Sequence, residues 1–178
     1  MKLHIFGASG TGVTTLGKAL SAALGRPYFD SDDYFWEATK PAFTVRRAEE
    51  ERDALLARDL EPESDWILGG SMHSWGGHWT RQAELVVFLW LPPDLRLARL
   101  RQREQARYGS QLTTDAACAA RSAIFLAWAA GYDTGASGGS RTLANHTRWL
   151  SEFASPVLEL RGDLSTAARV MRVRAALG

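Results

Sequence analysis

The sequence predicts an α/β domain of three layers, in which helices cover both faces of a five-stranded, mainly parallel sheet. Five short apolar segments alternate with helix-like segments along the chain, and this alternation is typical of such a fold. The segment 85–91 is apolar at every position, as in a parallel strand that is buried on both faces. The chain has 178 residues, of which 46% are apolar, and this size predicts one domain over residues 1–178.

Three of the predicted strands lie in the first 70 residues. Each is short and apolar, and each is followed by glycines or acidic residues. An Ala/Leu-rich segment that stops at Gly25 and a charged segment that stops before Pro62 predict helices. In chain order we expect a strand at 2–6, a helix at 14–24, a strand at 28–29, a helix at 44–60 and a strand at 66–68.

The second half of the chain predicts two strands and three helices. The strand at 85–91 stops at Pro92 and Pro93. Residues 131–140 contain four glycines, two serines and no bulky aliphatic residue, so we expect a flexible loop there rather than a linker between domains. The other expected elements are helices at 94–107 and 114–130, a strand at 157–160 and a helix at 164–177.

The composition excludes several classes of protein. Cys118 is the only cysteine, which rules out an intramolecular disulfide framework and a multi-cysteine metal cluster. The longest apolar run, 85–93, is far shorter than the roughly 20 residues of a membrane helix, and the N-terminus lacks a signal-peptide pattern. A net charge of +1 gives no reason to expect nucleic acid or a membrane as the main partner. We therefore predict a cytoplasmic protein, a monomer or homodimer, with small-molecule partners.

A glycine-rich segment after the first strand has the spacing of a P-loop. Its outer glycines are Gly7 and Gly12, Thr14 holds the hydroxyl position, and Val13 stands where lysine is usual. Glycines let successive backbone N–H groups point at one anion, and the start of the next helix adds its positive end. The segment therefore predicts a phosphate-binding loop, whose expected binding residues are Gly7, Ser9, Gly10, Thr11, Gly12, Val13, Thr14 and Thr15.

With this loop, the chain resembles the P-loop kinases of the adenylate kinase and shikimate kinase type, and more closely a bacterial group of adenylate-kinase-like proteins whose loop also lacks the lysine. The resemblance covers nearly the whole chain and rests on segments 7–15, 29–34, 69–70, 96–109 and 128–133. It implies a P-loop NTPase fold, ATP and Mg²⁺ as cofactors, an acceptor-binding region at about 30–65 and a mobile lid at about 104–145. It also implies that the turn at Arg161 holds the adenine of the donor.

Two carboxylates follow the second predicted strand. Asp30 and Asp32 point to the same face as long as the strand continues, at the edge where an α/β sheet opens its ligand crevice. We predict that Asp32 and Thr14 hold Mg²⁺, and that Asp30 orients or deprotonates the acceptor hydroxyl. The alternative is that residues 30–33 form a turn and a helix cap.

Residues beside these carboxylates are candidates for the acceptor site. Aromatic rings next to a crevice can stack on a base or cover a sugar, and core packing is the alternative for each ring. No arginine follows Gly70 before Arg81, although adenylate kinases supply one there for a monophosphate. We therefore expect a neutral hydroxyl acceptor, such as a nucleoside or another small metabolite. The predicted substrate-binding residues are Asp33, Tyr34, Trp36, Arg47, Gly69, Gly70 and Trp75.

Arginines are concentrated after the fourth predicted strand, where residues 94–121 hold six arginines against three acids. In the resembled kinases, the corresponding helix leads into a lid whose arginines close over the donor phosphates. Guanidinium groups suit phosphoryl oxygens, whereas a solvated basic helix face is the alternative. We predict catalytic roles for Arg103, Arg107 and Arg141, and we expect Arg103 or Arg107 to replace the missing lysine. Arg121 is a further candidate for the lid.

Together these residues predict an ATP-dependent phosphotransferase that acts on a small metabolite, a nucleoside or a nucleotide. The alternative is a P-loop nucleotide-binding protein, an ATPase or sensor, that is catalytically weakened and marked by Val13. The Asp-x-Asp pair and the lid arginines argue against a complete loss of phosphotransfer. A third hypothesis, an RNA or DNA modifier, is disfavoured because the chain has no nucleic-acid-binding motif.

Overall fold

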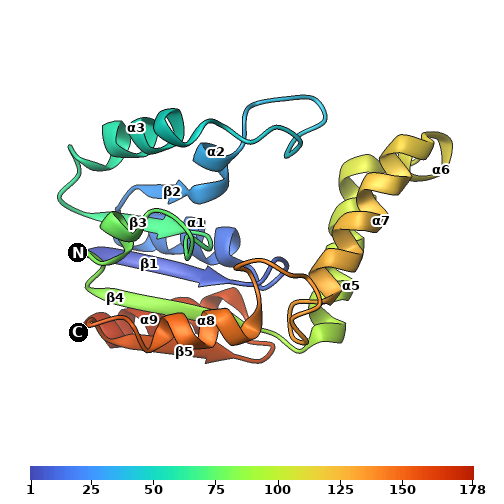
Figure 1. Cartoon of the computed structure of the whole chain (residues 1–178). Coiled ribbons are helices and arrows are strands. Elements are labelled where there is room, and N and C mark those ends of the chain that lie inside the picture. The colour runs from blue at the N-terminus through green and yellow to red at the C-terminus, as the bar shows by residue number, and fades with distance from the viewer.

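The computed structural model describes residues 1–178 and shows a sheet between two layers of helices, with a helical arm beyond the carboxyl ends of the strands (Figure 1). The five strands are β1 (Lys2–Gly7), β2 (Tyr28–Asp30), β3 (Trp66–Gly69), β4 (Leu85–Trp90) and β5 (Val157–Arg161). They lie in the order β2-β3-β1-β4-β5, and every neighbouring pair is parallel. The predicted fold class is therefore confirmed.

Helices form the two outer layers and the arm. Their bounds are α1 (Val13–Leu24), α2 (Ser31–Phe35), α3 (Glu49–Leu60), α4 (Gly77–Thr80), α5 (Pro93–Tyr108), α6 (Gln111–Thr114), α7 (Ala116–Ala130), α8 (Leu143–Leu150) and α9 (Thr166–Leu177). The arm consists of α5, α6 and α7 (Figure 1). No helix of the chain has the length and hydropathy that a membrane span requires.

Each face of the sheet has its own apolar core, because side chains alternate between the two faces of a strand. On one face, Ile5 of β1 packs in a cluster with Leu16 of α1 and Val173 of α9. On the other face, Phe6 belongs to a cluster that includes Trp149 of α8, and the two ring centroids lie 4.6 Å apart. Full burial of such a side chain stabilises the fold by about 1.5–3 kcal/mol. The two cores hold the carboxyl ends of all five strands at one edge.

The helix that we expected over 44–60 begins only at Glu49. The residues before it form turns and bends, and Trp36 and Arg46 form an isolated antiparallel bridge at the two ends of this stretch. Three glutamates occupy the first turn of α3, where the positive end of the helix dipole favours acidic residues. The segment 36–48 is therefore a loop between α2 and α3.

The structure begins the helix expected over 114–130 at Ala116, and it adds four short helices that the sequence did not predict, α2, α4, α6 and α8. Asp115 separates α6 from α7 and caps α7 by accepting bonds from the N–H groups of Ala117 (2.9 Å) and Cys118 (3.2 Å). The longest of the four is α8, which follows the capping residue Thr142. It has only eight residues, and helices of this length depend on tertiary packing for their stability.

Candidate active site

The predicted phosphate-binding loop forms one wall of a cavity of about 440 Å³. Gly10 and Gly12 have φ angles of 88° and 96°, a region that glycine adopts without strain. Gly12 is also the N-cap of α1 and supplies no side chain to its first N–H groups, which leaves them for an anion. Thr11 is the one predicted loop residue outside the cavity lining, because its buried hydroxyl donates to the Ala8 carbonyl (2.8 Å).

Asp30 connects the loop to the sheet. Its Oδ2 accepts bonds from the Thr14 hydroxyl (2.8 Å) and the Tyr28 hydroxyl (2.9 Å), and its Oδ1 accepts the Asp32 N–H (3.2 Å). β2 ends at Asp30 and α2 begins at Ser31, so the expectation that one strand carries both carboxylates on the same face is wrong. The turn into α2 nevertheless brings Asp30 and Asp32 to the lining of the same cavity. Asp30 is therefore both a helix cap and a cavity residue.

Asp32 lies where this cavity meets a second one. The Arg141 Nη2 atom is 3.8 Å from Asp32 Oδ1. Desolvation raises the pKa of Asp32, Arg141 opposes this effect, and the charge of Asp30 adds to it. A carboxylate with a raised pKa that faces a cavity is suited to accept a proton.

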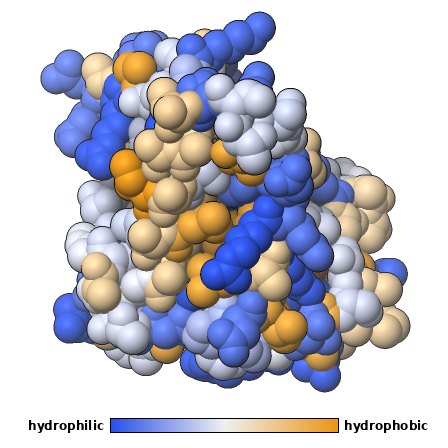
Figure 2. All heavy atoms as spheres, turned by 90° about the vertical axis from the view of Figure 1, so that its right-hand side faces the viewer, coloured by the Kyte–Doolittle hydropathy of each residue, from blue (hydrophilic) through white to orange (hydrophobic).

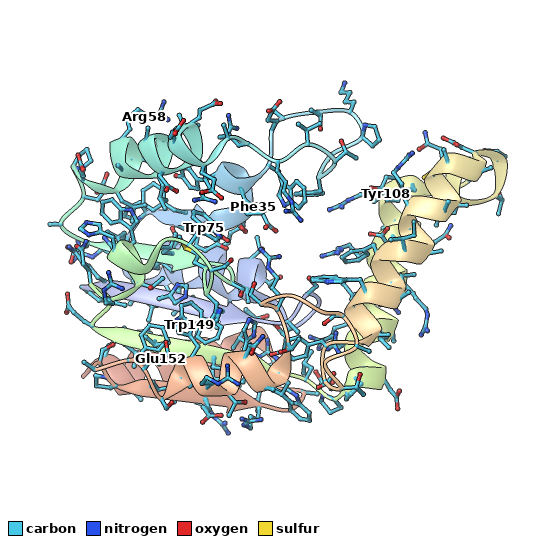
Figure 3. The ribbon with its side chains drawn as sticks, viewed as in Figure 1. Phe35, Arg58, Trp75, Tyr108, Trp149 and Glu152 are labelled. Carbon is cyan, nitrogen blue, oxygen red and sulfur yellow. The ribbon has the colours of Figure 1, made fainter.

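The second cavity has a volume of about 860 Å³, and both aromatic rings and polar side chains line it. Figure 3 shows Phe35 and Trp75 on the sheet side of this space and Tyr108 on the arm. In Figure 2, the face that carries both cavities is hollowed, and hydrophobic residues lie beside hydrophilic ones. The residues shared by the two cavities are Ser9, Asp32, Ser71, Arg103, Arg107, Trp128 and Arg141.

Five arginines line the second cavity, and four of them have no carboxylate partner. Only Arg141 lies within ion-pair distance of a carboxylate, that of Asp32, and Glu104 is the other acidic residue of the lining. The Arg103 guanidinium lies 5.2 Å from the ring of Phe125, and the Arg107 guanidinium lies 5.1 Å from another ring of the lining. Such unbalanced positive charge favours anionic ligands. The five residues are Arg46, Arg103, Arg107, Arg121 and Arg141.

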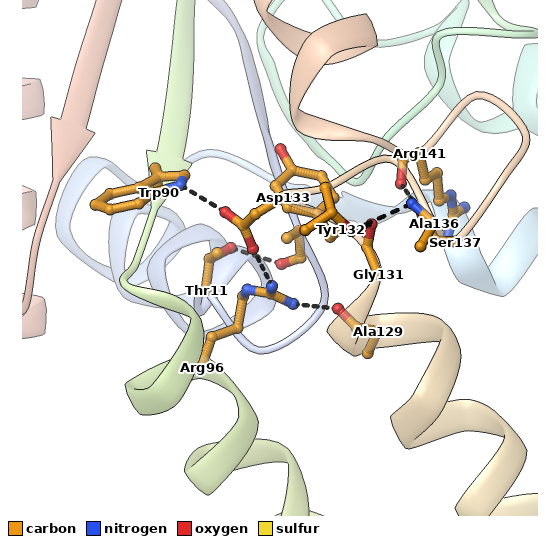
Figure 4. Close-up of polar contacts among 12 residues, drawn as sticks. Thr11, Trp90, Arg96, Ala129, Gly131, Tyr132, Asp133, Ala136, Ser137 and Arg141 are labelled. Carbon is orange, nitrogen blue, oxygen red and sulfur yellow. Dashed lines mark hydrogen bonds and ion pairs between the residues drawn. The ribbon is translucent and has the colours of Figure 1, made fainter.

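A buried ion pair fixes the start of the glycine-rich segment 131–140 to the base of the arm (Figure 4). Arg96 of α5 is 1% exposed and donates to Asp133 Oδ2 (2.5 Å) and to the Ala129 carbonyl (2.8 Å). The second Asp133 oxygen accepts the indole N–H of Trp90 (3.1 Å). The predicted flexible loop is thus a series of turns that is tied to α5 and β4 at Asp133.

A chain of hydrogen bonds behind the cavities was missed by the sequence analysis. His146 of α8 is fully buried, with its Nε2 2.8 Å from the Ser71 hydroxyl and its Nδ1 2.9 Å from the Tyr132 hydroxyl. Burial lowers the pKa of His146 to about 3, and the charge of Arg141 adds to this effect. Ser71 and Tyr132 both line the first cavity. The sequence gave a signal for Ser71, directly after Gly70, and for Tyr132 within segment 128–133, but none for His146.

The predicted substrate-binding residues separate into two groups. Trp36 and Trp75 line the second cavity, and Gly70 lines the first. A Cβ atom on Gly70 would lie 1.8 Å from the Ser31 hydroxyl oxygen, and one on Gly69 would lie 2.3 Å from the Tyr28 hydroxyl oxygen. These two glycines therefore allow β3 to pass close to β2 and α2, and Gly69 itself lies outside both linings.

Four other predicted residues also lie outside both cavities. Tyr34 is buried and donates to Asp59 Oδ2 (3.1 Å). Arg47 donates to the carbonyl oxygens of Tyr34 (3.0 Å) and Trp36 (3.2 Å), so it holds the loop 36–48 in place. The other two are Asp33, which is exposed, and Arg161, which pairs with Glu159.

Comparisons with known proteins identify the family to which the chain belongs. The family model described as "AAA domain" matches residues 4–117. The uncharacterized protein YqaC of Bacillus subtilis is 42% identical over 171 residues, which are 96% of this chain and 94% of that protein. A cytidylate kinase of Archaeoglobus fulgidus is 30% identical over 115 residues, 58% of this chain and 62% of that protein.

Solved structures share the fold over the whole chain. A shikimate kinase from Acinetobacter baumannii in complex with shikimate superposes with a TM-score of 0.57, at 19% identity, over 99% of this chain and 92% of that chain. At this identity the similarity concerns the fold. The chain therefore belongs to the AAA domain family and is a P-loop protein of the adenylate kinase and shikimate kinase type.

Proposed function

We propose that the protein is an ATP-dependent phosphotransferase that acts on a small acceptor carrying both a hydroxyl group and a negative charge. One observation carries this proposal: Asp32 lies at the junction of a phosphate-loop cavity and a second cavity lined by aromatic rings and arginines. A donor phosphate on the loop and an acceptor in the second cavity would meet at this carboxylate.

The loop residues fit the triphosphate of ATP. The first N–H groups of α1 have no side-chain cap, and the cavity of about 440 Å³ has room for phosphates. The contacts favour Thr14 and Asp30, which are joined by a 2.8 Å hydrogen bond, as the residues that would hold Mg²⁺. When bound, the ion would neutralise phosphate charge.

Asp32 is then the group that receives the acceptor proton. This exchanges the roles that the sequence suggested for the two carboxylates, because Asp30 is occupied by two hydroxyl groups while Asp32 faces both cavities. In the proposed step, the acceptor oxygen forms a bond to the γ-phosphorus and the bond to the bridging oxygen of ADP breaks. The hydroxyl proton passes to Asp32. Arg103, Arg107 and Arg141 line both cavities and would neutralise charge on the transferred group.

The lining of the second cavity favours an anionic acceptor with a planar ring over the neutral acceptor expected from the sequence. That expectation rested on the absence of an arginine directly after Gly70. The fold supplies other arginines instead, since Arg46 of the loop 36–48 and Arg121 of α7 line only the second cavity. Each lacks a carboxylate partner, and Arg46 lies 5.7 Å from the ring of Phe35. Nucleoside monophosphates have both the charge and the planar ring that such a lining would bind, and cyclic hydroxy acids have the charge.

The proposal is tested by measuring ADP release from ATP with matched acceptors. The panel contains each nucleoside beside its monophosphate, together with shikimate and gluconate. We expect turnover with an anionic acceptor and at least about tenfold lower kcat/KM with its uncharged counterpart, because a charge-assisted hydrogen bond contributes about 1.5–3 kcal/mol.

Matched variants identify the acceptor site. Arg46→Met and Arg121→Met should each raise the acceptor KM about tenfold or more and leave the KM for ATP within about twofold. Arg58→Met is the control, because Arg58 is exposed on α3 and lies outside both cavities. ATP binding without ADP release from any acceptor would contradict the proposed activity, and equal use of charged and uncharged acceptors would contradict the proposed acceptor class.

A further inference from the structure

A buried arginine lies against the phosphate-binding loop from the side of the last helix. Arg169 of α9 is 4% exposed, and its Nη1 donates to the Thr11 carbonyl over 2.7 Å. Its Nη2 reaches the Gly162 carbonyl at 3.4 Å, and its buried Nε has no hydrogen-bond partner. Arg169 has no ion pair, because the nearby Asp163 pairs with Arg99 (2.6 Å). The loop is therefore in contact with a buried guanidinium group that forms no ion pair of its own.

The lysine position of the same loop carries no charge. Val13 is the first residue of α1, and it packs against the apolar cluster that α1, α9 and the sheet form. Gly12 lies between the two features, since a Cβ atom there would be 3.1 Å from Arg169 Nη1. P-loops usually carry a lysine at the position that Val13 occupies here. That charge is absent, and Arg169 of α9 instead contacts the peptide group between Thr11 and Gly12.

The hydrogen bond from Arg169 to the Thr11 carbonyl also affects the N–H group at the opposite end of the same peptide unit. The peptide bond between Thr11 and Gly12 is trans, so the Thr11 carbonyl and the Gly12 N–H point in opposite directions. A guanidinium that donates to the carbonyl polarises the whole peptide group and makes its N–H a stronger donor. Gly12 lines the phosphate cavity.

We infer that Arg169 is a positioning residue that supplies the phosphate-binding loop with the positive charge that Val13 does not. This inference rests on the proposed binding of ATP at the loop. It differs from the expectation that Arg103 or Arg107 alone replaces the lysine, because those two residues belong to the arm and line both cavities.

The test measures the Kd of Mg²⁺-ATP by the fluorescence of the seven tryptophans. Arg169→Met should weaken binding about 10- to 100-fold, the range expected for the loss of a charged hydrogen bond. Val13→Lys in the native background should improve binding less than about tenfold. In the Arg169→Met background, the same substitution should restore the Kd to within about fivefold of the native value, because each cation then compensates for the other. Arg172→Met is the matched control, since Arg172 is exposed on the same helix.

Restoration of the Kd by Val13→Lys would show that Arg169→Met weakens ATP binding by removing a charge. A loop that had lost its structure would not recover when a lysine is added. Should Arg169→Met fail to fold, Arg169→Lys, which keeps the charge, must bind ATP more tightly than Arg169→Gln, which keeps only hydrogen-bond donors. An unchanged Kd in Arg169→Met, a failure of Val13→Lys to restore it, or a gain of about 100-fold from Val13→Lys alone would overturn the inference. If the native protein does not bind ATP, it is the proposed function that fails.

Discussion

The phosphate-binding loop and the helical arm both present positive charge to the same hollow, but they hold it differently. At the loop, the donors are backbone N–H groups at the start of α1, and Arg169 behind them is buried and bonded to carbonyls. On the arm, Arg103, Arg107 and Arg121 line the cavities without ion-pair partners and rest partly on aromatic rings. The loop is organised before any ligand arrives, whereas the arm keeps its charges available.

This difference indicates how the two regions divide the work of binding. A preorganised anion site binds without reordering side chains, which suits a donor that every reaction needs. Arginines on an arm gain their partners only when an anion enters, and closure of such elements over a substrate is a common step in kinases. A buried ion pair between Arg96 and Asp133 anchors the base of the arm. We therefore expect different effects from substitutions at Asp32, at this anchor and at the histidine behind the cavities.

The largest expected effect is on kcat, when Asp32 at the junction of the two cavities is replaced. Asp32→Asn should lower kcat by at least about 100-fold with little change in the Kd of ATP, because it removes the proposed proton acceptor while the loop stays intact. ADP release and tryptophan fluorescence measure the two quantities.

The control for this substitution is Asp33→Asn, one residue further along α2 and outside both cavities. If Asp32 served only the helix, both variants would lose stability alike, and the activity of each folded molecule would be unchanged.

The second effect is on the free energy of unfolding, when the ion pair between Arg96 and Asp133 at the base of the arm is broken. Asp133→Ala leaves Arg96 buried without its carboxylate, and breaking a buried ion pair in this way costs about 3–5 kcal/mol of unfolding free energy. Urea denaturation monitored by circular dichroism measures this loss.

The arm supplies its own matched control, because Arg99 on the same helix forms an exposed pair with Asp163. Asp163→Ala should cost only about 0–1 kcal/mol, the usual range for a surface ion pair. Equal losses in the two variants would show that the base of the arm is held by something other than the buried pair.

The smallest effect concerns the histidine behind the two cavities. The folded-state pKa of His146, about 3, lies below the ordinary 6.5, so the unfolded chain binds one more proton in between. Stability should therefore fall as the pH is lowered from about 6.5 towards 3, with a slope of up to about 1.4 kcal/mol per pH unit from this residue. Urea denaturation between pH 7 and pH 4.5 should give a shallower slope for His146→Gln than for the native chain. Replacement of the exposed His78 by Asn is the control, and an unchanged slope in His146→Gln would contradict the prediction.

The sequence predicted the class of the fold and the position of the phosphate loop because both depend on local patterns. Segment 85–91 is apolar throughout, and it forms the strand β4. The spacing of Gly7, Gly12 and Thr14 was visible because these residues act within one turn between a strand and a helix. The start of α3 was not predicted correctly from the sequence. Arg46 forms a bridge with Trp36, ten positions earlier, and the helix begins only after this bridge.

The pairing of distant side chains was decided only by the tertiary structure. Arg169 and Thr11 are 158 positions apart, and His146 and Ser71 are 75 positions apart, so no local pattern relates them. The same holds for Arg46, which the fold brings to the cavity that the arm lines and on which the proposal of an anionic acceptor rests. The physical reason is that periodicity and turn chemistry fix the path of the backbone over short stretches. Which charges then meet depends on how the helices pack against the sheet.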